Sequence, residues 1–167
     1  MLVRERHPDA TLVIAGSGPL RATLEALALE LGIARAVTFT GRVDNAGMAA
    51  LYRNADVMLN CSLVDNMPNS VLEALACGVP VVSTDVGGVP YLVEHGSTAL
   101  LVPPQAPREM ADAVLRLAAE PLLADSLREA GLRQVQQYTW PSVRPRLFAV
   151  YRDVLAARRG TPAVNPQ

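Results

Sequence analysis

Apolar residues in this chain follow two patterns, short continuous runs and positions three or four residues apart. Runs such as residues 11–15 and 79–83 are rich in β-branched side chains and predict buried strands. Leu20, Leu24, Leu27 and Leu31 recur at helical spacing, and Gly32 follows them as a residue that favours the end of a helix. The beginning of the chain is therefore predicted to fold as a strand, a turn and a helix.

The same unit repeats along the chain. Strands are predicted over residues 11–15, 36–39, 56–60, 79–83 and 98–102, and helices over residues 20–31, 47–53, 69–77, 107–119 and 121–137. A last helix is predicted from about Ser142 onward, because this start leaves Pro145 in the first turn, where a missing N–H costs little. Alternating helices and nearly all-apolar strands predict an α/β fold, a Rossmann-like parallel sheet with helices on both faces.

Length and composition narrow the class of protein. With 167 residues and 50% hydrophobic content, residues 1–157 are expected to form a single domain, and the polar residues 158–167 a disordered tail. A net charge of −1 gives no broad basic field for nucleic acid, so any anion site must be local. No apolar run reaches the roughly 20 residues of a membrane span, and no secretion signal is evident, so a cytoplasmic location is expected. Cys61 and Cys77 lack metal-ligand spacing and are interpreted as buried reduced thiols, and no metal site is predicted.

The stretch from Asp65 to Gly88, DNMPNSVLEALACGVPVVSTDVGG, carries the most chemical information. Asp65 lies in a polar loop and Glu73 about one turn inside the following helix, on either side of the helix start. The first N–H groups of a helix lack intrahelical partners and carry partial positive charge, so a phosphate group could bind there. A nucleoside diphosphate sugar fits such a site. Structural roles also stay open, because Ser70 and Glu73 match a capping box and Asp65 could be a capping aspartate.

This stretch resembles the signature of the retaining group 1 glycosyltransferases of the GT-B fold, which carries two carboxylates eight positions apart, an Ala-Cys-Gly-x-Pro-Val-Val segment and a Gly-Gly turn. Further matching segments are LVIAGSGP (12–19), VTFTGRV (37–43), ADVMLNCS (55–62), STALLVPP (97–104) and YTW (138–140). The resemblance implies the carboxy-terminal, nucleotide-sugar-binding domain of an enzyme of polysaccharide biosynthesis. Such an enzyme transfers a sugar from a nucleoside diphosphate sugar to a hydroxyl acceptor, such as a glycan or lipid-linked glycan, without a metal or a further cofactor.

The resemblance also implies roles for individual residues. Asp65 would be the catalytic carboxylate that faces the donor sugar, and Glu73 would hydrogen-bond the ribose hydroxyls. The helix start at residues 69–71 would stabilise the departing negative charge. The remaining residues that the resemblance places in the substrate site are Asn66, Met67, Pro68, Asn69, Ser70, Val71, Gly16, Gly18, Gly41, Arg42 and Val43. Because DNMP replaces the family's commoner Glu-Gly-Phe-Gly, a different donor selectivity is expected.

The beginning of the chain departs from the family pattern. The family's domain opens with a strand and a loop bearing an arginine and a lysine, after an amino-terminal acceptor domain, whereas this chain begins at the family's second strand. The family's first strand would lie between strands 11–15 and 56–60, and these two strands are expected to pair directly in its place. The expected partners are the nucleotide sugar and either the acceptor domain or a second copy of the chain. Contact with a membrane is expected only through the acceptor domain. The chain alone is expected to be inactive.

Two other functions stay open at this point. One is a binding module, a remnant that kept the fold but lost the transfer chemistry. The other is a sugar-nucleotide epimerase, which shares the architecture but needs acid and base side chains that the sequence does not supply.

Overall fold

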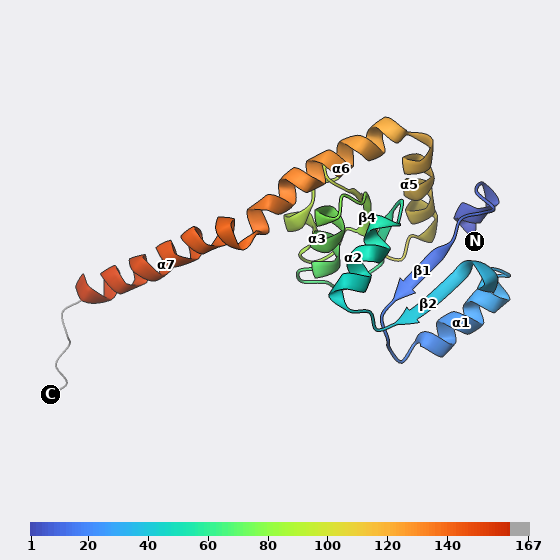
Figure 1. Ribbon diagram of the computed structural model, residues 1–167, viewed down its shortest axis with the longest axis horizontal. Helices are drawn as coiled ribbons and strands as arrows, with labels where there is room; N and C mark the ends of the chain where they lie inside the picture. Colours follow the sequence, from blue (N-terminus) through green and yellow to red (C-terminus); the bar gives the residue numbers. More distant parts are fainter. Residues whose placement is uncertain (161–167) are drawn as a thin grey trace.

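Two separate parallel sheets form the centre of the molecule, which is a computed structural model that describes residues 1–160 (Figure 1). In the first sheet β1 (Leu12–Ala15) pairs with β2 (Val37–Gly41), and Leu12 lies opposite Val37. In the second sheet β4 (Val81–Thr84) lies between β3 (Met58–Asn60) and β5 (Leu100–Val102). Every pairing is parallel, as the alternation of strands and helices predicts.

The first sheet belongs to a small unit that the sequence pattern defines well. After β1 the chain forms α1 (Arg21–Glu30), and Gly32 follows it with a left-handed φ of 68°. The 3-10 helix η2 (Ala34–Ala36) then leads into β2. Next comes α2 (Asn45–Arg53), which begins earlier than predicted because the side chain of Asp44 accepts a hydrogen bond from the N–H of Gly47 at 2.8 Å.

Helices cover both faces of the second sheet. The helices around it are α3 (Asn69–Ala76), α4 (Val89–Leu92), α5 (Pro107–Ala119) and α6 (Pro121–Val135). Val81 belongs to a buried cluster with Leu75 of α3, whereas Val82 belongs to another with Leu117 of α5 and Leu127 of α6. Because neighbouring residues of a strand point to opposite faces, these two clusters lie on the two sides of β4. The hydrophobic core of the chain therefore surrounds β4.

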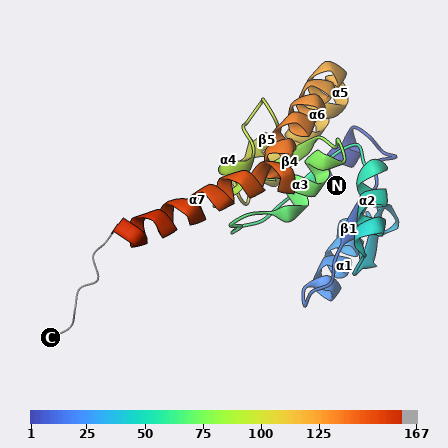
Figure 2. The ribbon, with the colours of Figure 1, turned by 60° about the vertical axis from the view of Figure 1, so that its left-hand side comes forward.

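The expected direct pairing of β1 with β3 is wrong. The two strands belong to different sheets, and in residues 1–160 no strand pairs with both of them. Both views show β1 apart from β4, the central strand of the second sheet (Figures 1 and 2). The sheets are joined through other elements: η1 (Leu2–Glu5) lies against α5, and Tyr52 of α2 is buried in the cluster around α3. These attachments leave one edge of β1 and one edge of β3 unpaired.

The last helix, α7 (Trp140–Gly160), projects away from the rest of the molecule after the short 3-10 helix η3 (Gln136–Tyr138) (Figure 1). Its start differs from the prediction, because the backbone N–H groups of Ser142 and Val143 donate to the carbonyl oxygen of Thr139. The helix begins at Trp140, so Pro145 lies inside it. It continues through Gly160, and the other residues of the predicted tail, 161–167, lie outside the described part of the chain.

The two thiols differ from the expectation of burial. Cys61, directly after β3, is exposed, and Cys77, at the end of α3, is half-buried. Both are free. Cys61 follows the last residue of the strand, where the chain leaves the sheet, and so it falls outside the core that the apolar pattern indicates.

Candidate functional site

One group of predicted site residues lies where β1 and β2 end. The backbone N–H of Gly16 donates a hydrogen bond to the carbonyl oxygen of Gly41 at 2.8 Å, and both glycines have positive φ. Nε of Arg42 donates to Oγ of Ser17 at 3.3 Å, and Arg42 is exposed. A Cβ added at Gly16 or Gly18 would meet no atom within 4 Å. The structure thus brings these loops together around open space, with Arg42 beside it and Nη1 of Arg21 3.8 Å from the position of a Cβ added at Gly41.

Val43, predicted to contact the substrate, lies against α2. A Cβ added at Gly47 would come within 2.5 Å of Cγ1 of Val43. The valine is half-buried, and its side chain therefore fixes the loop of residues 41–43 to the first turn of α2. Its backbone remains next to Arg42.

The second group of predicted residues lies at the start of α3. Pro68 is buried and precedes the helix without a capping side chain. In residues 1–160 the N–H groups of Asn69 and Ser70 donate no hydrogen bond, whereas the N–H of Val71 donates to the carbonyl oxygen of Pro68 at 3.1 Å. The expectation that residue 71 offers a free N–H is wrong, and its side chain is 0% exposed. The donors left for an anion are those of Asn69 and Ser70.

Asp65 is attached to a buried polar network at the ends of β3 and β4. Oγ of Ser62 lies 3.2 Å from Oδ2 of Asp65 and 2.8 Å from Oδ1 of Asn60, and its single proton is shared between them. Nδ2 of Asn60 donates to Oγ of Ser83 at 3.1 Å. The hydroxyl of Thr84 donates to the carbonyl oxygen of Ser62 at 2.6 Å. Because Asn60, Ser83 and Thr84 are buried, this network holds the half-buried Asp65 carboxylate in place.

The backbone beside Asp65 is held by the turn at residues 87 and 88. The N–H of Gly88 donates to the carbonyl oxygen of Asp65 at 2.8 Å. A Cβ at Gly87 would lie 2.0 Å from that same oxygen, and a Cβ at Gly88 would lie 1.5 Å from the carbonyl oxygen of Asn66. No side chain fits at either position. The Gly-Gly turn therefore sets the path of the loop.

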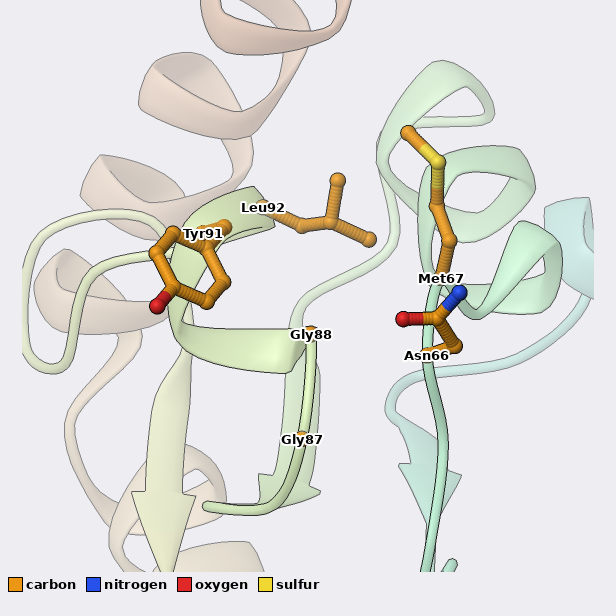
Figure 3. A pocket seen from close by; sticks show the side chains of 6 residues that line it. All are labelled: Asn66, Met67, Gly87, Gly88, Tyr91 and Leu92. Carbon is orange, nitrogen blue, oxygen red and sulfur yellow. The ribbon is translucent and has the colours of Figure 1, made fainter.

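A shallow pocket of about 180 Å³ lies between this loop and α4 (Figure 3). Asn66 and Met67 line it from the loop, and Tyr91 and Leu92 line it from α4, where the side chain of Leu92 extends toward the loop. Asn66, Met67 and Tyr91 are exposed, so the pocket is open to solvent.

Glu73 has a different partner from the one that a capping box requires. The helix begins at Asn69 without a side-chain cap, so the capping interpretation of Ser70 and Glu73 is wrong. The hydroxyl of Tyr52 instead lies 3.3 Å from Oε2 of Glu73 and 3.2 Å from the carbonyl oxygen of Ser70, and its single proton is shared between these two acceptors. Burial, and next the Glu73 carboxylate, raise the pKa of Tyr52 to about 12. Tyr52 is therefore a neutral hydrogen-bond donor at neutral pH.

The residues that hold the two carboxylates were missed by the sequence reasoning. They are Tyr52, Asn60, Ser62, Ser83 and Thr84. A signal for four of them was present, since polar residues follow apolar runs at the carboxyl ends of two predicted strands, where ligands of parallel sheets bind. Tyr52 carried no comparable signal, because a tyrosine in an amphipathic helix is typical of packing.

Residues 1–160 contain no group of three or more His, Cys, Asp or Glu side chains placed to hold a metal ion. None of the helices described is both long and apolar enough to cross a membrane.

Comparisons with known proteins agree on one family. The sequence profile described as Glycosyl transferases group 1 matches residues 1–120. The D-inositol 3-phosphate glycosyltransferase of Saccharomonospora viridis is 34% identical over 156 residues, covering 90% of this chain and 36% of that protein. The GDP-mannose-dependent alpha-(1-6)-phosphatidylinositol monomannoside mannosyltransferase of Mycobacterium tuberculosis is 36% identical over 164 residues, covering 93% and 43%.

Solved structures show the same likeness. Sucrose-phosphate synthase from Thermosynechococcus elongatus superimposes with a TM-score of 0.79 at 27% identity, over 93% of this chain and 49% of that chain. HepE of Anabaena, solved in complex with UDP-glucose, superimposes with a TM-score of 0.73 at 21% identity, over 81% and 40%. The fold is thus that of one Rossmann-like domain of a GT-B glycosyltransferase. The chain spans less than half of the length of each of these four proteins.

Proposed function

Because this chain belongs to the group 1 glycosyl transferases, we propose that it is the carboxy-terminal, donor-binding domain of a retaining glycosyltransferase. Residues 1–157 form this domain, which binds a nucleoside diphosphate sugar and needs no metal or further cofactor. The observation that carries the proposal is the start of α3, where two free N–H groups lie between Asp65 and Glu73. Glu73 has a hydrogen-bond partner, Tyr52, from α2, and Asp65 has one, Ser62, from its own loop.

The donor is proposed to lie across the carboxyl ends of both sheets. The diphosphate accepts hydrogen bonds from the N–H groups of Asn69 and Ser70, where the helix dipole favours negative charge. Glu73 accepts hydrogen bonds from the ribose, and the base lies against the loop of residues 41–43. Asp65 and the backbone of residues 66–68 face the sugar. The glycines at positions 16 and 18 leave room for the nucleotide.

The proposed reaction is transfer with retention at the anomeric carbon. The bond from that carbon to the diphosphate oxygen breaks, and the acceptor oxygen forms a new bond on the same face of an oxocarbenium-like sugar. The acceptor proton passes to the departing phosphate oxygen. The donors at the start of α3 lower the barrier because they stabilise the negative charge that develops on the leaving group. Asp65 stabilises the positive charge on the sugar.

The complete enzyme is proposed to include an amino-terminal acceptor domain, and the chain alone is proposed not to turn over. Support comes from the shorter length of the chain relative to its relatives and from the unpaired edges of β1 and β3. A second copy that pairs with these edges is the other proposed partner. A cytoplasmic location and a glycan, lipid-linked glycan or polyol acceptor belong to the same proposal.

Titration calorimetry with UDP, GDP, ADP and their glucose or mannose esters tests the donor site. We expect the wild-type chain to bind at least one nucleotide, and Glu73→Ala to weaken that binding by about tenfold or more, the size expected for a hydrogen bond to a charged group. Glu129→Ala is the matched control, because Glu129 is exposed on α6 and pairs only weakly with Arg133 at 3.6 Å. Absence of binding across the panel would favour a remnant that lost its ligand, and equal losses in both variants would remove Glu73 from the site.

A further inference from the structure

We propose that Tyr52 is a positioning residue that holds the Glu73 carboxylate in the orientation needed to bind the ribose hydroxyls. The inference rests on the proposed function, since it concerns the same donor site. It adds a residue from a different element, α2, that touches no part of the donor in that proposal. The geometry of the hydroxyl and the burial of the ring carry it.

The tyrosine ring is fixed in place. Tyr52 is 6% exposed and belongs to the cluster that contains Val71, Ala74 and Leu75 of α3. Its hydroxyl lies 3.2 Å from the carbonyl oxygen of Ser70 and 3.3 Å from Oε2 of Glu73. Both acceptors belong to α3, so the hydroxyl contacts the helix backbone and the carboxylate at once.

Glu73 needs such a partner because its side chain is exposed. A free glutamate on a helix surface samples several rotamers, and binding a ligand through it would require ordering the side chain at that moment. A hydrogen bond from Tyr52 to Oε2 orders the carboxylate in advance. Oε1 and the remaining lone pairs then stay available for hydroxyl donors, because a carboxylate accepts several hydrogen bonds.

The donor that Tyr52 provides is permanent under ordinary conditions. Burial and the neighbouring carboxylate raise the pKa of Tyr52 to about 12, so the hydroxyl keeps its proton at neutral pH. If Tyr52 served packing alone, its hydroxyl would be dispensable, and a phenylalanine would fill the same place. The two interpretations therefore differ only in what the hydroxyl does.

The same helix also holds the loop proposed to contact the base. Asp44 caps the start of α2 directly after residues 41–43, and Val43 packs against Gly47 in its first turn. Tyr52 lies near the other end of this helix. The base-facing loop and the ribose-facing carboxylate are therefore attached to opposite ends of one rigid element.

The test compares ribonucleotides with 2′,3′-dideoxynucleotides, which lack both hydroxyls. Calorimetry measures dissociation constants for UDP and GDP and for their dideoxy forms, in the wild-type chain, Tyr52→Phe, Glu73→Ala and the double variant. Tyr138→Phe is the matched control, because Tyr138 packs against the same cluster and its hydroxyl donates to the carbonyl oxygen of Tyr91 at 3.4 Å. Circular dichroism confirms that each variant is folded.

We expect the wild-type chain and Tyr138→Phe to prefer the ribonucleotide by about tenfold or more. In Tyr52→Phe the preference should fall to within about threefold, while affinity for the dideoxynucleotide stays unchanged. In the Glu73→Ala background, Tyr52→Phe should have no further effect, as expected for residues that act through one interaction.

Different results overturn different claims. A full ribose preference in Tyr52→Phe, or equal losses for both nucleotides, would show that the hydroxyl serves packing and would overturn the inference while leaving the donor site in place. A wild-type chain that binds nucleotides without ribose preference would overturn the role of Glu73 and with it this inference. A wild-type chain that binds no nucleotide would overturn the proposed function itself.

Discussion

The two sheets of this chain have similar sequence patterns and very different burial. All four residues of β4 are buried, whereas no residue of β1 is, and Leu12 and Val13 are 40% and 46% exposed. The difference comes from their neighbours, because β4 has a strand on each side and helices on both faces, while β1 pairs only with β2. An apolar strand is therefore buried only where other strands and helices cover it.

The helices repeat this contrast. Leu75 of α3 is 1% exposed and packs against Gly131 of α6, whereas Leu27 of α1 is 45% exposed. The second sheet with its helices thus forms the stable part of the chain. The first sheet and α1 carry half of the proposed donor site, although their residues are much less buried.

The largest expected effect is loss of a core side chain from the second unit. Leu75→Ala should lower the free energy of unfolding by about 2–5 kcal/mol, because it leaves a cavity between α3 and α6. Leu27→Ala, on the exposed face of α1, should cost less than about 1 kcal/mol. Urea unfolding followed by circular dichroism measures both. Similar losses would contradict the contrast between the two units.

Glycine substitutions give the next largest effect. Gly88→Ala should cost on the order of 3 kcal/mol, because its Cβ would lie 1.5 Å from the carbonyl oxygen of Asn66 and backbone must move. Gly18→Ala places its Cβ in open space and should change stability by no more than about 0.5 kcal/mol. The same urea titration applies. A harmless Gly88→Ala would show that the loop at residues 65–66 is not held by this turn.

Alkaline pH should weaken the contact between the two units through Tyr52. Its pKa is raised from 10.0 to about 12, so between these values the unfolded chain loses the tyrosine proton first and stability falls as pH rises. The loss amounts to on the order of 2 kcal/mol, complete above pH 12 and absent below pH 10. The sequence contains no lysine, so no lysine titration overlaps this range, and the three other tyrosines and the two cysteines are common to the wild-type chain and to Tyr52→Phe.

Tyr52→Phe provides the reference for this measurement. Unfolding free energies of the wild-type chain and of this variant, measured from pH 9 to about pH 12, should converge as the pH rises, because the variant lacks the titrating group. If the unfolding free energies of the two proteins changed in parallel with pH, this would contradict the raised pKa of Tyr52.

Much of the fold follows from the sequence, and the failures have physical causes. The strands β1 to β5 and the helices α1, α2, α3, α5 and α6 were predicted near their observed positions because most have a clear apolar period and a glycine or proline near one end, whereas the short helix α4 was not predicted. The pairing of β1 with β3 was predicted wrongly, since lateral pairing depends on helix attachments such as that of η1 to α5. The start of α7 was also misplaced, because Thr139 provides the acceptor that begins the helix at Trp140.

In the candidate site, the sequence predicted the positions of segments but not the hydrogen-bond partners of single groups. The loop at Asp65 and the start of α3 could be located from residue types and spacing. The partner of Glu73 could not, because a capping box and a contact to Tyr52 look alike in sequence and only the position of α2 separates them. The N–H of Val71 was likewise counted as free, although it donates to Pro68.

The most direct test of the account is the position of a bound nucleotide. Two-dimensional ¹⁵N–¹H spectra of the labelled chain, recorded during titration with UDP or GDP, report which backbone amides change environment. We predict that the amides of Asn69 and Ser70 and those of Gly16 and Gly41 shift together with one dissociation constant, because the ligand spans the ends of both sheets. Shifts confined to one sheet, or to α6 alone, would contradict a donor site at the start of α3.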